Sequence, residues 1–219
     1  MLTCAILMTS RCQKGGEPLL VMELCAGGSL KALLSSARTG ETPKPTVFNL
    51  TTYGYELSKA MTFLEHHSLL HRDLAARNIL LTAELTVKLA DFGLSRTVGT
   101  SDYYRRTAGQ SAPIPVRWTA PETLDDNLST IESDRWSFGV VLWEIFSLAA
   151  KPYVGVENFE IAGHVRSGHR LGQPLLCPLD IYSVMQQCWA IVPRDRPAFT
   201  VMSAQIYTSL VNSGDHPIL

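Results

Sequence analysis

Apolar residues near the start of the chain predict a pair of β-strands. Two short apolar runs, residues 2–8 and 19–24, lie on either side of a polar stretch at residues 13–18 that contains two glycines and a proline. Apolar runs of this length joined by turn-forming residues are typical of a β-hairpin. We therefore expect a hairpin in the first 25 residues.

The spacing of apolar residues then changes to the helical period. Ser29 is placed to cap a short helix over residues 30–34, because its hydroxyl can accept a hydrogen bond from a free N–H of the first turn. Residues 35–49 contain one glycine and two prolines and are expected to form an exposed loop. From residue 51 to about residue 67, apolar side chains recur at helical spacing and predict a long amphipathic helix.

The second half of the chain combines two short strands with several helices. Residues 79–81 and 87–89 are short apolar segments that predict strands, and a polar loop is expected at residues 97–115. From residue 119 the pattern is mainly helical. Residues 137–148 are apolar nearly all round, which is typical of a helix buried in a core, and residues 181–190 form another candidate helix. The pattern as a whole predicts a hairpin followed by a mostly helical body.

Composition and charge narrow the class of protein without naming a partner. Hydrophobic residues make up 46% of the chain and charged residues 18%, which is typical of a globular domain. The net charge of −1 gives no electrostatic reason to expect nucleic acid as a partner. The five cysteines show no metal-ligand spacing and indicate a reduced, intracellular environment. The longest apolar-rich run, residues 138–150, is shorter than the ~20 residues that cross a bilayer, so no targeting or membrane segment is expected.

The strongest chemical signal is a pair of motifs in the middle of the chain. The sequence HRDLAARN occupies residues 71–78, and DFG follows at residues 91–93. Either motif alone could be a structural feature without a catalytic role, since DFG is a common turn and HRD often marks a surface ion pair. Together, with one predicted strand after Asn78 and another before Asp91, they resemble the catalytic loop and the metal-binding motif of protein kinases. The resemblance implies that Asp73 is the catalytic base and that Asn78 and Asp91 hold Mg²⁺ against the phosphates of ATP.

Two further segments resemble the tyrosine-directed members of this family. The first is Ala-Ala-Arg, ending at Arg77, where serine/threonine-directed members carry a lysine, and the second is PVRWTAPE at residues 115–122. The resemblance implies that Arg77 helps to orient phosphate and substrate. Trp118 would form a rigid wall that holds the longer tyrosine side chain farther out, although simple core packing is an alternative role for this tryptophan.

The segment from residue 91 to residue 122 resembles the activation segment of a kinase. Tyr103 and Tyr104 lie near its middle and are the implied phosphorylation sites. A phosphate attracts arginines, so Arg72 and Arg96 are the candidate partners of a phosphotyrosine. The alternative is that both tyrosines are ordinary exposed loop residues.

Other residues are implied to hold the site together or to bind the nucleotide. Residues 22–25, MELC, resemble the hinge between kinase lobes: Met22 would be the gatekeeper, the backbones of Glu23 and Cys25 would bind adenine, and Leu80 would form the pocket floor. The implied structural residues are His71 and Arg72, together with Asp134, which would brace the catalytic loop, and a pair formed by Glu122 and Arg196. These pairs could instead be surface ion pairs of little energetic weight.

The resemblance covers residues 2–206 and implies an α+β protein-kinase-like fold. The implied division is a remnant of the smaller N-terminal lobe with the hinge at residues 1–25, a mainly helical C-lobe at 26–210 and a tail at 211–219. No G-x-G-x-x-G occurs before the hinge, and the 21 residues before Met22 are too few for the phosphate-binding loop and its lysine. We therefore expect a fragment of a larger kinase, with impaired activity in the chain as given.

A second departure from the family pattern is Arg135, where kinases usually carry a small apolar residue. Burying an unpaired arginine is costly, so we expect it to reach solvent or to pair with Glu132.

Three functions are compatible with these observations. The first is a protein tyrosine kinase that uses ATP and Mg²⁺ and acts on tyrosines of protein substrates in signal transduction. The second is a catalytically inactive, kinase-like scaffold or binding module, and the third, disfavoured by Arg77 and Trp118, is a serine/threonine kinase. The expected location is cytoplasmic, either as a soluble kinase or as the intracellular part of a membrane receptor.

Overall fold

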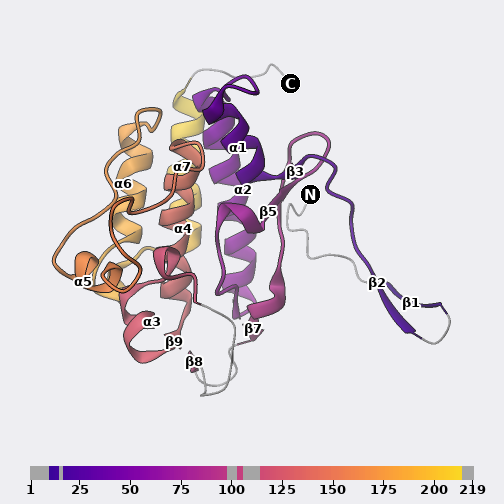
Figure 1. Ribbon diagram of the computed structural model, residues 1–219, viewed down its shortest axis with the longest axis horizontal. Coiled ribbons are helices and arrows are strands. Elements are labelled where there is room, and N and C mark those ends of the chain that lie inside the picture. Colours follow the sequence, from indigo (N-terminus) through magenta and orange to yellow (C-terminus); the bar gives the residue numbers. More distant parts are fainter. Residues whose placement is uncertain (1–9, 15–16, 98–102, 106–113, 214–219) are drawn as a thin grey trace.

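A computed structural model describes residues 10–14, 17–97, 103–105 and 114–213 of the chain. Most of the described residues are helical. In Figure 1 the longer helices run side by side, a small sheet lies along one side of them, and a hairpin projects beyond that sheet. The helices are α1 (Leu30–Thr39), α2 (Val47–His66), α3 (Pro121–Asp126), α4 (Ile131–Phe146), α5 (Ile161–Arg166), α6 (Leu179–Cys188) and α7 (Phe199–Asn212).

The strands are short and all pair antiparallel. One sheet has three strands in the order β3-β5-β6, and the other sheets are two-stranded pairs, β1-β2, β4-β7 and β8-β9. The catalytic-loop motif lies between β4 and β5, and the DFG motif follows β6 directly. The strands are β1 (Ser10–Lys14), β2 (Glu17–Val21), β3 (Gly28–Ser29), β4 (Leu69–Leu70), β5 (Ile79–Leu81), β6 (Val87–Leu89), β7 (Arg96–Thr97), β8 (Tyr104–Arg105) and β9 (Leu128–Ser129).

Helix α4 is the centre of the hydrophobic core. It packs against α2 and α6, and α7 packs against α2 and α6. The ring of Phe138 on α4 meets that of Phe199 on α7 edge to face, with centroids 5.4 Å apart. Gly139 lets α6 approach closely, because an added Cβ there would lie 2.6 Å from the Cβ of Cys188. The predicted burial of this helix on nearly all sides is confirmed.

Two helices begin earlier than predicted because polar residues cap them. Helix α2 starts at Val47 rather than residue 51, since Thr46 and Asn49 exchange side-chain-to-backbone hydrogen bonds in a capping box. Helix α4 starts at Ile131 rather than residue 137, and Thr130 and Ser133 form the same arrangement. In the first turn of α2 only the capping residues themselves are polar, and the apolar residues Val47, Phe48 and Leu50 lie outside the predicted helix.

The prediction of an exposed loop at residues 35–49 is wrong at both ends, because α1 covers residues 35–39 and α2 covers residues 47–49. The predicted cap is confirmed, since the Ser29 hydroxyl accepts from the Ala32 N–H at 3.2 Å. Helix α1, however, continues to Thr39 because Leu34 and Ala37 are buried against the core. It ends at Gly40, whose φ of 84° lies in the left-handed region that glycine adopts without strain.

A hairpin is present near the N-terminus as predicted, but its strands occupy residues 10–14 and 17–21 instead of residues 2–8 and 19–24. Strands β1 and β2 pair from Ser10 with Val21 to Lys14 with Glu17. Strand β1 has the polar sequence SRCQK and comes after the apolar run that predicted the first strand. That run, residues 2–8, lies outside the described residues. Strands β5 and β6 match the predicted segments 79–81 and 87–89. Helix α7 extends to Asn212, two residues into the expected tail.

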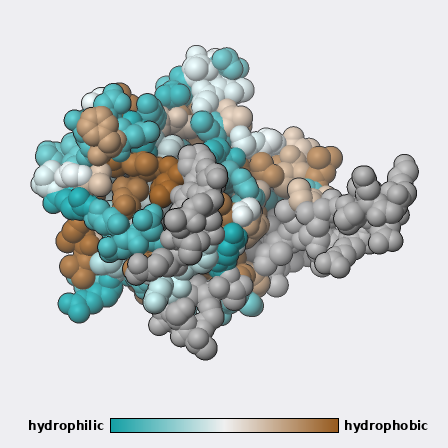
Figure 2. Space-filling view, turned by 60° about the horizontal axis from the view of Figure 1, so that its bottom comes forward, coloured by the Kyte–Doolittle hydropathy of each residue, from teal (hydrophilic) through white to brown (hydrophobic). Residues whose placement is uncertain are grey.

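Large hydrophobic side chains are also found at the surface. Figure 2 shows one face on which hydrophilic residues predominate and hydrophobic residues gather in a few places between them. Apolar atoms contribute much of any protein surface, so scattered exposure of this kind needs no special role. Among the described residues no helix is long and apolar enough to span a membrane. The most exposed of the large hydrophobic residues are Leu24, Val154, Phe159, Leu175 and Leu179.

Candidate active site

One buried carboxylate holds the backbone at the start of the catalytic-loop motif. Asp134, in the first turn of α4, is 1% exposed and accepts hydrogen bonds from the backbone N–H groups of His71 at 2.7 Å and Arg72 at 3.0 Å. Burial raises the pKa of Asp134, while His71 and these N–H groups act to lower it. Arg72 has a φ of 70°, a strained value for a residue with a side chain, and the two bonds to Asp134 hold it there. The predicted bracing role of Asp134 therefore matches the geometry.

Asp73 is fixed by the two polar residues that end the motif. The amide nitrogen of Asn78 donates to the Asp73 carbonyl at 2.7 Å and to its Oδ2 at 2.8 Å. The guanidinium of Arg77 forms an ion pair with Oδ1 of the same carboxylate. Asn78 lies at the end of a short 3₁₀ turn, Ala76–Asn78, which brings its side chain back over the loop. The carboxylate of Asp73 is thus oriented by neighbours four and five residues along the chain.

The DFG motif is joined to the catalytic loop by backbone and side-chain contacts. The N–H of Ala90 donates to the Asn78 carbonyl at 2.9 Å, and Nε2 of His71 lies 3.1 Å from the Ala90 carbonyl oxygen. The ring of Phe92 packs against the His71 ring with centroids 5.3 Å apart. Asp91 itself has left-handed backbone angles, and its Oδ1 accepts from the Gly93 N–H at 3.4 Å. His71 therefore links the two motifs, in keeping with its predicted structural role.

The carboxylates of Asp73 and Asp91 border the same hollow, which has a volume of about 610 Å³. Asp73, Arg77 and Asp91 line it together with Trp118 from the far end of the activation segment. The hollow therefore brings together a base, a cation and a second carboxylate beside an aromatic wall. Its other lining residues are Gly93, Leu94, Ile114 and Pro115.

Two side chains of the catalytic-loop and DFG motifs offer oxygen donors that suit a hard divalent cation. Mg²⁺ prefers oxygen ligands, usually one or two carboxylates supplemented by water and phosphate. Asp91 offers an exposed carboxylate. Asn78 uses its amide nitrogen in both bonds to Asp73, so its amide oxygen is not used in them. Asn78 and Asp91 therefore offer the kind of oxygen donor that Mg²⁺ prefers, and their role as its ligands stays a prediction.

The aromatic wall is tied to the catalytic loop by a residue that sequence reasoning missed. Glu144 on α4 is 3% exposed, and its Oε2 accepts from the indole N–H of Trp118 at 2.7 Å and from the Ala76 N–H at 2.9 Å. Burial raises the pKa of Glu144. The Arg77 guanidinium lies 4.9 Å from the centre of the Trp118 ring, within the range of a cation–π contact. The signal in the sequence was a glutamate inside an otherwise apolar helix, which needs a buried partner.

The described part of the activation segment places one tyrosine next to the predicted arginines. Tyr104 lies on β8, and the Cζ atoms of Arg72 and Arg96 are 4.1 Å and 5.7 Å from its ring centre. Arg72 is itself held by a hydrogen bond from its Nη1 to the Leu94 carbonyl at 2.9 Å. Tyr103 is 48% exposed. Both guanidinium groups therefore lie beside the ring of Tyr104, and their pairing with a phosphate on this tyrosine stays a prediction.

The far end of the activation segment is anchored by the predicted ion pair. Arg196 donates from Nη1 and Nη2 to the two carboxylate oxygens of Glu122, at 2.6 Å and 2.9 Å. The Arg196 side chain is fully buried and the Glu122 side chain 24% exposed. The alternative of a weak surface ion pair is therefore wrong for this contact, because a buried arginine that lost its partner would be strongly unfavourable.

The predicted hinge residues do not line this hollow. Met22 is 51% exposed, and the Glu23 carboxylate pairs with Lys88 of β6 at 3.2 Å. The Cys25 carbonyl accepts from the Gly28 N–H at 3.2 Å in a turn. Leu80 lies on the central strand of the three-stranded sheet, opposite Ser29 and Lys88. Their proposed contacts with adenine stay predictions.

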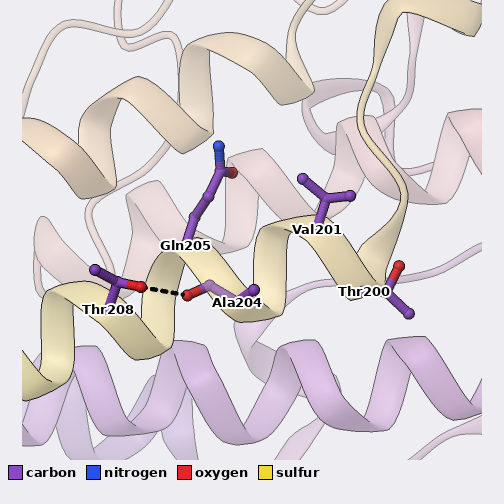
Figure 3. A pocket seen from close by; sticks show the side chains of 5 residues that line it. All are labelled: Thr200, Val201, Ala204, Gln205 and Thr208. Atoms are coloured by element: carbon purple, nitrogen blue, oxygen red, sulfur yellow. Dashed lines mark hydrogen bonds between the residues drawn. The ribbon is translucent and has the colours of Figure 1, made fainter.

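A second hollow, of about 470 Å³, lies against α7 and offers no comparable chemistry. Figure 3 shows its side chains, among which the Thr208 hydroxyl donates to the Ala204 carbonyl of the same helix at 3.0 Å. Its lining contains no carboxylate, histidine or cysteine that could act as a base or as a strong metal ligand. The lining consists of Thr200, Val201, Ala204, Gln205 and Thr208.

Comparisons with known proteins agree with this geometry. The family model described as "Protein tyrosine and serine/threonine kinase" matches residues 4–206. The tyrosine-protein kinase receptor TYRO3 of Rattus norvegicus is 39% identical over 207 residues, and that of Mus musculus 38% identical over the same length; each match covers 92% of this chain and 23% of the relative. The TYRO3 receptor of Danio rerio is 40% identical over 190 residues, covering 86% of this chain and 22% of the relative. The chain thus spans less than a quarter of the length of these relatives.

Proposed function

Because the chain belongs to the protein tyrosine and serine/threonine kinase family, we propose that it transfers the γ-phosphate of ATP to tyrosine hydroxyls of proteins. The observation that carries this proposal is the shared hollow of Asp73, Arg77 and Asp91. Phosphoryl transfer requires little covalent chemistry from the protein. It requires a base, oxygen ligands for a metal ion and a wall that positions the acceptor.

Asp73 is the proposed base. Its carboxylate accepts the proton of the tyrosine hydroxyl while the phenolic oxygen forms a bond to the γ-phosphorus. The bond from that phosphorus to the β,γ-bridging oxygen breaks, and ADP leaves with the electron pair. The ion pair with Arg77 and the hydrogen bond from Asn78 orient the carboxylate for this role.

Asn78 and Asp91 are the proposed ligands of Mg²⁺. When bound, the ion would neutralise negative charge on the phosphates of ATP. Met22, Glu23, Cys25 and Leu80 are proposed to contact the adenine, with residues 1–25 belonging to the smaller lobe and hinge and residues 26–210 to the larger lobe.

Tyrosine is the proposed acceptor because of the wall at Trp118. The indole is held by Glu144 on one side and covered by Arg77 on the other, so it is a rigid surface at the edge of the hollow. A tyrosine ring extends its hydroxyl farther from the backbone than a serine does and can lie against such a wall. The relatives named as tyrosine-protein kinase receptors support the same acceptor, and an intracellular kinase part of a receptor is the proposed setting.

Titration calorimetry with ATP and Mg²⁺ tests the nucleotide site of the purified chain. We expect binding that requires Mg²⁺ and that Asp91→Asn weakens at least tenfold, since the substitution removes a charged metal ligand. Asp125→Asn, which neutralises an exposed carboxylate on α3, is the matched control and should bind as the unchanged chain does. Equal binding by Asp91→Asn and the unchanged chain would contradict the assignment of Asp91, and absence of binding by a folded chain would contradict the proposed nucleotide site.

A further inference from the structure

Arg135 occupies a position in α4 that is unfavourable for a cation without partners. It is the fifth residue of the helix, near the N-terminal end, where the helix dipole disfavours positive charge. Its side chain is only 14% exposed, so water does little to solvate the guanidinium. The prediction that Arg135 either reaches solvent or pairs with Glu132 accounts for a small part of what is observed.

The main partner of Arg135 is Glu65, seventy residues earlier in the chain. Nη2 and Nε of Arg135 donate to Oε1 of Glu65 at 2.6 Å and 3.1 Å. The contact with Glu132 is longer, at 3.4 Å. The Glu65 side chain is also 14% exposed, so this is an ion pair largely removed from water. Such a pair is costly to break from one side, because the remaining charge stays buried.

Each member of the pair makes a second contact that reaches another part of the site. Oε2 of Glu65 accepts from the N–H of Phe199, the first residue of α7, at 3.1 Å. Nη1 of Arg135 donates to the backbone carbonyl of Arg196 at 3.1 Å. The side chain of Arg196 forms the ion pair with Glu122 at the end of the activation segment. Arg135 therefore connects the end of α2 to the backbone that carries this anchor.

Glu65 is close in sequence to the catalytic loop. It lies in the last turn of α2, which leads through β4 into His71. Asp134, the neighbour of Arg135, holds the backbone of that loop. The first turn of α4 thus carries adjacent side chains that hold the catalytic loop and the anchor of the activation segment.

We propose that Arg135 and Glu65 are positioning residues that fix the Arg196–Glu122 anchor, and with it the acceptor wall, relative to the catalytic loop. What the anchored segment does for substrate rests on the proposed function, whereas the mechanical link itself does not. If the pair acts in this way, its loss loosens the segment around Glu122 more than it loosens the core. If it only stabilises the fold, every part of the molecule loosens equally.

Amide hydrogen exchange separates these outcomes without ATP or substrate. The N–H groups of Thr123 and Leu124 both donate to the Ala120 carbonyl, at 3.1 Å and 3.2 Å, and report opening of this segment. Amides of Val141 and Leu142, in the buried middle of α4, serve as the reference for global opening. In Arg135→Met we expect exchange at residues 123 and 124 to rise at least tenfold more than at the reference amides. Equal rises at both places, or no rise, would overturn the proposal.

Two further variants make the test independent of the folding of that single mutant. The double variant Glu65→Met/Arg135→Met leaves neither charge unpaired, so it is expected to fold while lacking the same link, and it should show the same selective rise. Arg166→Met is the matched control, since it breaks an exposed ion pair with Asp125 that also ends on α3. It should change exchange at residues 123 and 124 less than twofold. A control effect equal to that of the double variant would refute a specific role for Arg135.

Discussion

At the scale of single residues, the site depends on side chains that are held by neighbours rather than left to solvent. Asp73 is oriented by Arg77 and Asn78, and Trp118 is oriented by Glu144. A base held in place needs no reorganisation when the acceptor arrives, which is the condition for efficient proton transfer. The geometry therefore accounts for the spacing of the motif at residues 71–78, in which the base and its two supports lie within one turn of chain.

The placement of Tyr104 predicts a difference between the two activation-segment tyrosines. Tyr104→Phe keeps the ring beside Arg72 and Arg96 but cannot be phosphorylated, so preincubation with Mg²⁺ and ATP should no longer raise the rate of peptide phosphorylation. Tyr103→Phe is the matched control and should retain most of the increase. Rates before and after preincubation measure the effect, and the reverse order of the two variants would contradict it.

The sequence was sufficient to propose the residues that would bear the chemistry, but it did not identify the residues that support them. Asp73, Asn78 and Asp91 were identified because their motifs are short and local in sequence. Glu144 and Glu65 were missed, because their partners lie 68 and 70 residues away in the chain. A single carboxylate in an apolar or amphipathic helix indicates that a buried partner exists, but the pattern cannot say which group it is.

At the scale of elements, helix ends are set by polar capping that the hydrophobic pattern does not show. Residues 46 and 130 cap α2 and α4 with reciprocal hydrogen bonds, and both helices begin several residues before the first apolar position that predicted them. The strands at residues 79–81 and 87–89 were predicted correctly, because the first and last residue of each is apolar and buried. Elements with a strong apolar period were therefore predictable, while their boundaries depended on local polar contacts.

The cap of α2 makes a specific prediction for stability. Thr46→Ala removes the hydroxyl that accepts from the Asn49 N–H at 3.1 Å, and such a loss costs about 1 kcal/mol of unfolding free energy. Thr42→Ala, in the exposed connection between α1 and α2, should change it by less than about 0.5 kcal/mol. Urea unfolding followed by circular dichroism measures both, and equal stability of the two variants would show that the cap contributes little.

At the scale of the whole molecule, α4 connects the fold to the site. Its middle is buried in the core, and its first turn holds the catalytic loop through Asp134 and the anchor of the activation segment through Arg135. Glu144 near its other end holds the acceptor wall. One central helix therefore supports three parts of the hollow, so a shift of α4 would disturb all of them together.

The transfer reaction itself is the most direct test of the proposed tyrosine kinase activity. Chain shown to bind Mg²⁺ and ATP should transfer label from [γ-³²P]ATP to a tyrosine peptide and not to the same peptide with serine in place of tyrosine. Asp73→Asn should bind ATP normally and lose about 10²- to 10⁴-fold in rate, the usual contribution of a catalytic base. Phosphotyrosine formed by Asp73→Asn at the rate of the unchanged chain, or transfer to the serine peptide in place of the tyrosine peptide, would contradict the account.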